Sequence, residues 1–213
     1  MQTENASPSF DERAKDWDED PKKVWRSQLT ADAILRTVKP ASNTTAFEFG
    51  CGTGLLSFAM KDAFAQITLS DTSDGMLDVL RRKITVAGAG HMRALRLDLT
   101  ADPLPAERYG IAYSVVTLHH IPDTDGVLHR LYELLQPGGT LCIADLDKED
   151  GSFHGPDEKV HHGFDREVLT RQAEAAGFAD VRFENILDIT KKVNGKDRAF
   201  PLFLMTAKKR PAT

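Results

Sequence analysis

The chain has few cysteines, only Cys51 and Cys142 among 213 residues. They are not spaced as C-x-x-C, which excludes a four-cysteine zinc site and an iron–sulfur cluster, and we expect both to be free thiols inside the fold. Long apolar runs are also absent, since the longest reach about ten residues and a membrane-spanning helix needs ~20. We therefore expect no disulfide framework and no membrane span.

Positive charge is not in excess either. Lys and Arg total 27 against 32 Asp and Glu, which gives a formal net charge of −5. Such a chain has no long-range attraction to polyanions, so nucleic acids and anionic membranes are disfavoured as partners. The first residues, Met1-Gln2-Thr3-Glu4-Asn5, lack the basic start and apolar stretch of a secretion signal. We expect a cytoplasmic monomer or homodimer.

The first 39 residues are predicted to form an N-terminal arm and a cap helix. Residues 1–20 are polar and show no sustained periodicity, which is typical of a mobile arm. Asp20-Pro21 then starts a helix that Lys39-Pro40 ends. The apolar face predicted for this helix consists of Val24, Trp25, Leu29, Ile34, Leu35 and Val38.

Residues 40–213 form the main predicted domain, in which β-rich runs alternate with helical stretches. This alternation predicts an α/β fold with a mostly parallel sheet and helices on both faces. The Asn194-Gly195 pair favours a hairpin, so the last strand should be antiparallel. The predicted strands are 44–49, 66–70, 92–97, 111–116, 139–145, 179–187 and 199–207, and the predicted helices are 54–64, 73–87, 125–135 and 165–176.

A glycine-rich turn follows the first strand of this domain. The strand ending Phe47-Glu48-Phe49 leads into Gly50-Cys51-Gly52-Thr53-Gly54 and then into an apolar helix. Glycines there allow positive φ and a close approach of a ligand to the backbone. The dinucleotide fingerprint G-x-G-x-x-G is not met, because leucines follow Gly54, and no G-K-S/T triplet is present. A turn that serves only to pack helix and strand is the alternative.

Two aspartates follow the next two strands. Asp71 lies 17 residues after Gly54, close to the ~20-residue offset at which an acidic side chain binds ribose hydroxyls. Asp98 ends the third strand, at the edge where open α/β sheets bind ligands, and can accept a hydrogen bond from an exocyclic amino group. Each aspartate alone is also a common turn former or helix cap.

In order along the chain, these motifs resemble the class I S-adenosylmethionine-dependent methyltransferases, in particular their small, single-domain, menaquinone-biosynthesis-like branch. The similarity covers about residues 40–208 and extends to Ser114–Ile121 at the end of the fourth strand and Leu134–Leu141 before the fifth. It implies a Rossmann-like, seven-stranded sheet and S-adenosylmethionine as cofactor. One departure is Gly110, where the family often has an acidic residue, but this position lies away from the ligand edge.

The resemblance also implies roles for individual residues. Glu48, Gly50 and Gly52 would surround the methionine part of the cofactor, Asp71 would bind ribose, and Met76, Asp98 and Leu99 would form the adenine site. The full set of expected cofactor-binding residues is Glu48, Gly50, Cys51, Gly52, Asp71, Thr72, Met76, Asp98, Leu99 and Val116.

Histidines provide the candidate catalytic groups. Methyl transfer from a sulfonium is an in-line displacement, so the enzyme aligns the nucleophile and accepts its proton where one must leave. We expect His120 and His119, at the end of the fourth strand, to be catalytic, and His154 and His161 to line the acceptor side. The alternative is that these rings only pack or bond to backbone.

We expect no metal site. The sequence does offer possible metal ligands, namely His154, His161 and His162 together with Asp147, Glu149 or Asp150. Their H-x₆-H-H spacing, however, matches no known metal motif, and the segment lacks a rigid helix to hold ligands.

The arm is interpreted as a lid, in which Phe10, Trp17 and the helix around Trp25 cover the cofactor and exclude water. The alternative is that both tryptophans only anchor the helix to the sheet. The expected function is methyl transfer to a small-molecule acceptor. Two alternatives stay open: a non-catalytic subunit that binds S-adenosylmethionine or S-adenosylhomocysteine, and a methyltransferase that acts on tRNA or protein with a partner.

Overall fold

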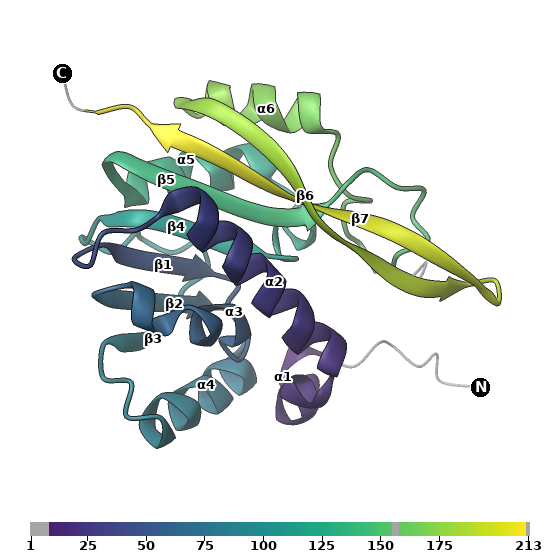
Figure 1. Ribbon diagram of the computed structural model, residues 1–213, viewed down its shortest axis with the longest axis horizontal. Coiled ribbons are helices and arrows are strands. Elements are labelled where there is room, and N and C mark those ends of the chain that lie inside the picture. The colour runs from purple at the N-terminus through teal and green to yellow at the C-terminus, as the bar shows by residue number, and fades with distance from the viewer. Residues whose placement is uncertain (1–8, 155–157, 212–213) are drawn as a thin grey trace.

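A computed structural model describes residues 9–154 and 158–211. Its centre is a seven-stranded sheet in the order β3-β2-β1-β4-β5-β7-β6 (Figure 1). Strands β1 to β5 pair in parallel, and β7 runs antiparallel to both of its neighbours. The predicted topology is confirmed. The strands are β1 Thr45–Phe49, β2 Gln66–Asp71, β3 Met92–Arg96, β4 Tyr109–Val115, β5 Leu135–Leu146, β6 Phe178–Val193 and β7 Lys196–Lys209.

Helices cover both faces of the sheet, as predicted. Side chains alternate along each strand, so that Ala46 packs toward α2, α3 and α4 while Phe47 packs toward α5 and α6. Both cysteines are buried and free. Among the described residues, no helix is long and apolar enough to span a bilayer. The α-helices are α1 Phe10–Arg13, α2 Pro21–Val38, α3 Leu55–Ala59, α4 Asp74–Val86, α5 Thr124–Leu134 and α6 Arg166–Ala175, and the 3₁₀ helices are η1 Ala14–Glu19, η2 Lys61–Ala63 and η3 Leu118–His120.

Two elements differ in length from their predictions. The helix predicted over 54–64 is divided at Met60, where α3 ends and η2 follows. Strands β6 and β7 are longer than expected and form a hairpin that projects past the rest of the sheet (Figure 1). Their outer halves carry mainly exposed polar and charged residues, which weakens the apolar alternation on which the prediction relied. The turn lies at Asn194 and Gly195, both at positive φ, as predicted.

Helix α2 buries the second half of the face predicted for it, where Leu35 and Val38 pack against the core, but not the first half. Ala31 and Ile34 are buried against the sheet, but Val24 is 43% and Trp25 is 54% exposed. The assignment of Val24 and Trp25 to the core face was wrong. The first turns of α2 border the cleft described below and do not lie on the sheet, and sequence periodicity alone does not report where a helix passes beyond its support.

The described part of the arm has a defined structure. Ser9 and Glu12 form a reciprocal capping box at the start of α1, and η1 continues to Glu19. The sequence did not predict these two short helices. Both pieces are short, and a helix of one turn leaves no periodicity to detect in the sequence.

Candidate functional site

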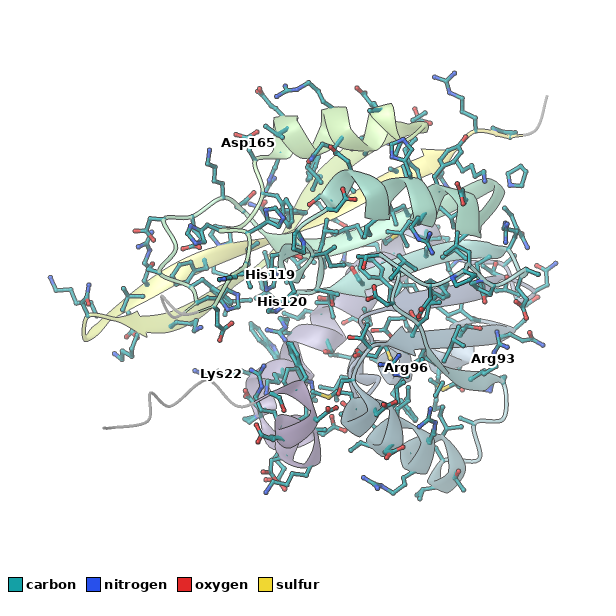
Figure 2. All side chains as sticks on the ribbon, turned by 180° about the vertical axis from the view of Figure 1, so that it is seen from behind. Lys22, Arg93, Arg96, His119, His120 and Asp165 are labelled. Atoms are coloured by element: carbon teal, nitrogen blue, oxygen red, sulfur yellow. The ribbon has the colours of Figure 1, made fainter. Side chains whose placement is uncertain are left out.

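A large cleft of about 1230 Å³ lies at the carboxyl ends of β1, β2 and β4. Its lining comes from the glycine turn, the segments after β2, β3 and β4, the arm, the first turns of α2, and β6. Figure 2 shows His119 and His120 between the start of α2, labelled at Lys22, and the start of α6, labelled at Asp165. This is the edge at which ligands bind in open α/β sheets, as the sequence predicted.

The glycine turn has the backbone geometry that requires glycine. Gly50, Gly52 and Gly54 all have positive φ, at 60°, 53° and 83°. A Cβ at Gly50 would lie 2.1 Å from the side chain of Thr117, which closes the turn from the β4 side. Any residue with a side chain would be strained here and would displace the neighbouring loop.

Asp71 joins two of the loops that line the cleft. One of its carboxylate oxygens accepts a hydrogen bond from the Gly52 N–H at 2.7 Å, and the other accepts one from the Ser73 N–H at 2.9 Å. Each oxygen keeps a second lone pair for a ligand hydroxyl. Burial raises the pKa of Asp71, and these backbone hydrogen bonds oppose the rise. The carboxylate is thus positioned in advance for a diol.

Asp98 and Leu99 lie at the same edge. Oδ1 of Asp98 accepts hydrogen bonds from the Thr100 backbone N–H at 2.8 Å and from its hydroxyl at 2.6 Å, so the aspartate does form a turn. These bonds lower its pKa. Both residues nevertheless line the cleft, as do Cys51, Thr72, Met76 and Val116. The structure brings all ten expected cofactor-binding residues together.

Glu48 occupies the buried end of the cleft. It is 1% exposed, accepts a hydrogen bond from the Ser57 hydroxyl, and Ser57 lies 2.7 Å from the Tyr113 hydroxyl. Burial raises the pKa of Glu48 to about 8. Sequence reasoning missed Ser57 and Tyr113, because a serine in an apolar helix and a tyrosine in a strand carry no signal until the fold pairs them with Glu48.

The arm is fastened across the cleft by two aspartates that the sequence analysis did not single out. Asp11 accepts hydrogen bonds from the Ser73 hydroxyl at 2.5 Å and the Gly75 N–H at 2.8 Å. Asp18 bonds to the hydroxyl of Thr53 and to the ammonium of Lys83, the latter at 2.6 Å. Both therefore attach the arm to segments that flank the glycine turn.

Two aromatic residues of the arm line the cleft itself. The Trp17 indole lies beside Gly52 and Met76. The ring of Phe10 contacts that of Trp17 and meets His120 edge to face, with centroids 6.0 and 5.5 Å apart. This arrangement is that of a cover over the cleft, and it favours the lid interpretation over simple anchoring.

The histidines divide into two groups. His119 is fully buried, and His120 and His154 border the cleft beside it. His161 lies outside the cleft lining, where its Nε2 is 2.9 Å from the carbonyl of Ile121 and fastens the loop after β5. Burial, with the neighbouring histidines, lowers the pKa of His120 to about 4, and burial also lowers the pKa of His154. His120 is therefore neutral at physiological pH and a weak proton acceptor.

Comparison with known proteins agrees with this geometry. Residues 46–139 match the model of a methyltransferase domain family. This stretch runs from the strand before the glycine turn to the turn within β5, and so contains Glu48, Asp71, Asp98 and both histidines of η3. Residues 46–139 therefore form a methyltransferase domain, and solved structures that share its fold include a complex with S-adenosylmethionine.

Proteins of similar sequence carry different functional names. An uncharacterised methyltransferase of Schizosaccharomyces pombe is 34% identical over 156 residues, covering 65% of this chain and 55% of the relative. A ubiquinone biosynthesis O-methyltransferase of Leptothrix cholodnii is 27% identical over 162 residues, covering 70% of this chain and 68% of the relative. This chain thus spans little more than half the length of the fission-yeast protein.

Among solved structures, a phosphoethanolamine N-methyltransferase of Haemonchus contortus, in complex with phosphomonomethylethanolamine and S-adenosylhomocysteine, superposes with a TM-score of 0.71 at 18% identity. The match covers 85% of this chain and 53% of that protein. It shows the common fold.

Replacement of Asp71 tests the ribose assignment. We expect Asp71→Ala to weaken S-adenosylhomocysteine binding by roughly 1–3 kcal/mol, because hydrogen bonds to a charged acceptor are lost. Asp74→Ala is the matched control, since Asp74 is an exposed aspartate three residues away that pairs with Arg96. Titration calorimetry measures both. Equal affinities of the two variants would remove Asp71 from the cofactor site.

Replacement of Asp11 tests the cover. We expect Asp11→Ala to raise the dissociation constant of S-adenosylhomocysteine by about threefold to tenfold and to speed proteolysis within residues 9–20, because the arm loses its bonds to Ser73 and Gly75. Asp16→Ala, on the same arm but paired only with Lys15 at the surface, should behave as the unaltered protein does. Faster proteolysis with unchanged affinity would show that the arm does not act as a lid on the cofactor.

Proposed function

We propose that this protein transfers the methyl group of S-adenosylmethionine to a small, anionic acceptor. The observation that carries the proposal is that one cleft is lined both by the glycine turn with Asp71 and by Arg26, His120 and His154. The first part suits the cofactor, and the second leaves room for an acceptor beside it.

The donor half of the cleft suits the charge and shape of the cofactor. Glu48, Gly50 and Gly52 would hold its methionine part, and Asp71 its ribose hydroxyls. Met76, Asp98 and Leu99 would enclose adenine, with the backbone of Leu99 and the carboxylate of Asp98 as polar partners. Cys51, Thr72 and Val116 complete the lining.

The acceptor end contains a buried arginine. Arg26 lines the cleft, its Nε atom is buried without a hydrogen-bond partner among the described residues, and it lies near Asp145, the carboxylate that is bonded to His119. Burial lowers the pKa of Arg26, and the nearby carboxylates of Asp20 and Asp145 oppose this effect. A buried guanidinium is stabilised when a ligand supplies an oxyanion. We therefore assign an acceptor that carries a carboxylate or phosphate group.

The names of the relatives support a small acceptor of this kind. The Leptothrix protein is named as an O-methyltransferase of ubiquinone biosynthesis, and the Haemonchus structure contains a phosphorylated acceptor. The cleft beneath Phe10 and Trp17, of about 1230 Å³, has room for the cofactor and a small acceptor. These observations favour a metabolite over tRNA or protein.

The chemistry that the cofactor supplies is a methyl group already activated on a sulfonium. The acceptor lone pair forms the new bond as the methyl carbon–sulfur bond breaks and its electrons pass to sulfur. The protein would hold the two reactants in line and exclude water through the arm and Arg26. A hydroxyl or amine acceptor must also lose a proton, and His120 or His154 at the cleft would receive it.

A paired acceptor panel with radiolabelled methyl donor tests the proposal. Each hydroxyl or amine compound is offered with and without a carboxylate or phosphate, and we expect turnover only on the charged member of a pair. Arg26→Met should raise the acceptor KM by about tenfold or more while leaving S-adenosylhomocysteine affinity unchanged. Methylation of tRNA or protein alone would overturn the acceptor assignment. Cofactor binding with no turnover on any substrate would indicate a non-catalytic subunit.

Glu48 gives a pH-dependent prediction. Its carboxyl is neutral below a pKa of about 8, whereas the ammonium group of the cofactor favours the ionised form. We therefore expect S-adenosylhomocysteine affinity to rise by about tenfold between pH 6 and pH 8, with proton release on binding. Glu48→Gln should remove this slope. Calorimetry in two buffers of different ionisation enthalpy measures both quantities, and a slope retained in the variant would contradict the assignment.

The same carboxyl predicts the pH dependence of stability in the ligand-free protein. The unfolded chain loses the Glu48 proton above pH 4.5, whereas the folded chain keeps it to about pH 8. The free energy of unfolding should therefore fall as the pH rises through this window and level off above it. Glu48→Gln should be flatter across the window in urea unfolding. An unfolding free energy that rises with pH equally in both proteins would show that Glu48 is ionised in the fold.

A further inference from the structure

Three imidazole rings from two distant parts of the chain meet beside the acceptor half of the cleft. His119 and His120 belong to η3 after β4, and His154 belongs to the loop after β5. One ligand nitrogen from each ring lies within 4.8 Å of the other two. The rings pack together, with the His119 centroid 4.2 Å from that of His120 and 4.9 Å from that of His154.

The proton on His119 is located by its surroundings. The carboxylate of Asp145 is buried and receives hydrogen bonds from the backbone N–H groups of His119 and Leu146, so it acts as an acceptor. Nδ1 of His119 lies 2.7 Å from Oδ1 of the same carboxylate and must donate to it. Nε2 of His119 then carries no proton and has a free lone pair.

His154 repeats the arrangement. Its Nδ1 lies 2.8 Å from Oε2 of Glu158 and donates to that carboxylate, which leaves Nε2 bare as well. The two Nε2 atoms face each other at 3.1 Å. Two lone pairs at that distance repel each other unless a cation lies between them.

We propose that His119, His120 and His154 form a binding site for a divalent transition-metal ion, zinc by the chemistry of its ligands. Imidazole nitrogen suits zinc and its neighbours and does not suit magnesium or calcium. Two zinc-bound nitrogens in a tetrahedral site are about 3.3 Å apart, close to the separation of the facing Nε2 atoms. A ring nitrogen of His120 lies within 4.8 Å of the ligand atoms of both other histidines.

The outer carboxylates strengthen this assignment. Metal-binding histidines usually donate their other ring N–H to a carboxylate or carbonyl, which fixes the ring and raises the basicity of the ligand nitrogen. Asp145 does this for His119, and Glu158 does it for His154. A plain packing role for these histidines would require no such pair of carboxylates.

The three histidines border two cavities, the main cleft and a smaller one. His120 and His154 line the main cleft, and His119 and His120 also line a smaller cavity of about 290 Å³ bounded by Lys159 and His161. Three protein ligands with an open fourth position are typical of catalytic zinc. On the proposed function, that position would hold an acceptor oxygen at the cleft. The metal site itself does not depend on that function.

This group differs from the one weighed on sequence spacing. His161 bonds to the carbonyl of Ile121, and the ring of His162 lies against Gly151. Neither joins the three-histidine group. The fold instead brings His154 to His119, 35 positions away, and no local motif encodes that pairing.

Metal content tests the site directly. The full chain, stripped with a chelator and then dialysed against Zn²⁺ and Mg²⁺ together, should retain one zinc and no magnesium per chain by elemental mass spectrometry. Co²⁺ should give intense visible bands typical of tetrahedral coordination. The double variant His120→Asn/His154→Gln should lose both signals. Glu158→Gln should weaken zinc binding by about tenfold to a hundredfold, because it removes only the outer carboxylate.

Exposed His129, on α5 and outside the group, provides the control His129→Ala, which should bind zinc as the unaltered protein does. Circular dichroism checks folding, and Glu158→Gln decides the question where the double variant fails to fold. Equal zinc retention by the unaltered protein, Glu158→Gln and the double variant would overturn the proposal, as would no retention by any of them. A proton shared between the Nε2 atoms would then explain their contact. S-adenosylhomocysteine titration of the zinc-free chain separately tests the proposed function.

Discussion

The carboxylate of Asp71 is the interaction on which the site depends. It holds the glycine turn through Gly52 and the start of α4 through Ser73. The arm is fastened to that same segment through Asp11. The Asp71 side chain fixes the spacing between the two loops. The glycine turn and the arm are therefore both held relative to the start of α4. Glycine adopts the positive φ angles of this turn without strain, and Asp71 and Thr117 contact the turn from two sides.

Charge is divided along the cleft in a way that the net charge does not reveal. Glu48, Asp71 and Asp98 border the part of the cleft proposed for a cationic cofactor, whereas Arg26, His120 and His154 border the part proposed for the acceptor. An overall charge of −5 disfavours long-range attraction to polyanions but is compatible with a local anion site. The two halves suit ligands of opposite charge, and this reduces competition between them for one position.

The sequence predicted what depends on neighbouring residues and missed what depends on distant ones. Strand alternation, the Gly50–Gly54 turn and the two aspartates after strands are local patterns, and each was confirmed in place. The network of Glu48 with Ser57 and Tyr113, and the contact of His119 with His154, join residues from separate elements. The prediction that Trp25 lies on the core face was wrong for the same reason. An apolar residue at helical spacing gives the same sequence pattern whether it packs on a sheet or borders a cleft.

The arm leads into α2 without an intervening loop, because Asp20 both ends η1 and caps α2. The arm brings Trp17 to the glycine turn, and the first turns of α2 bring Trp25 and Arg26 to the same cleft. A displacement of the arm that carried the start of α2 with it would therefore widen the cleft at both places together.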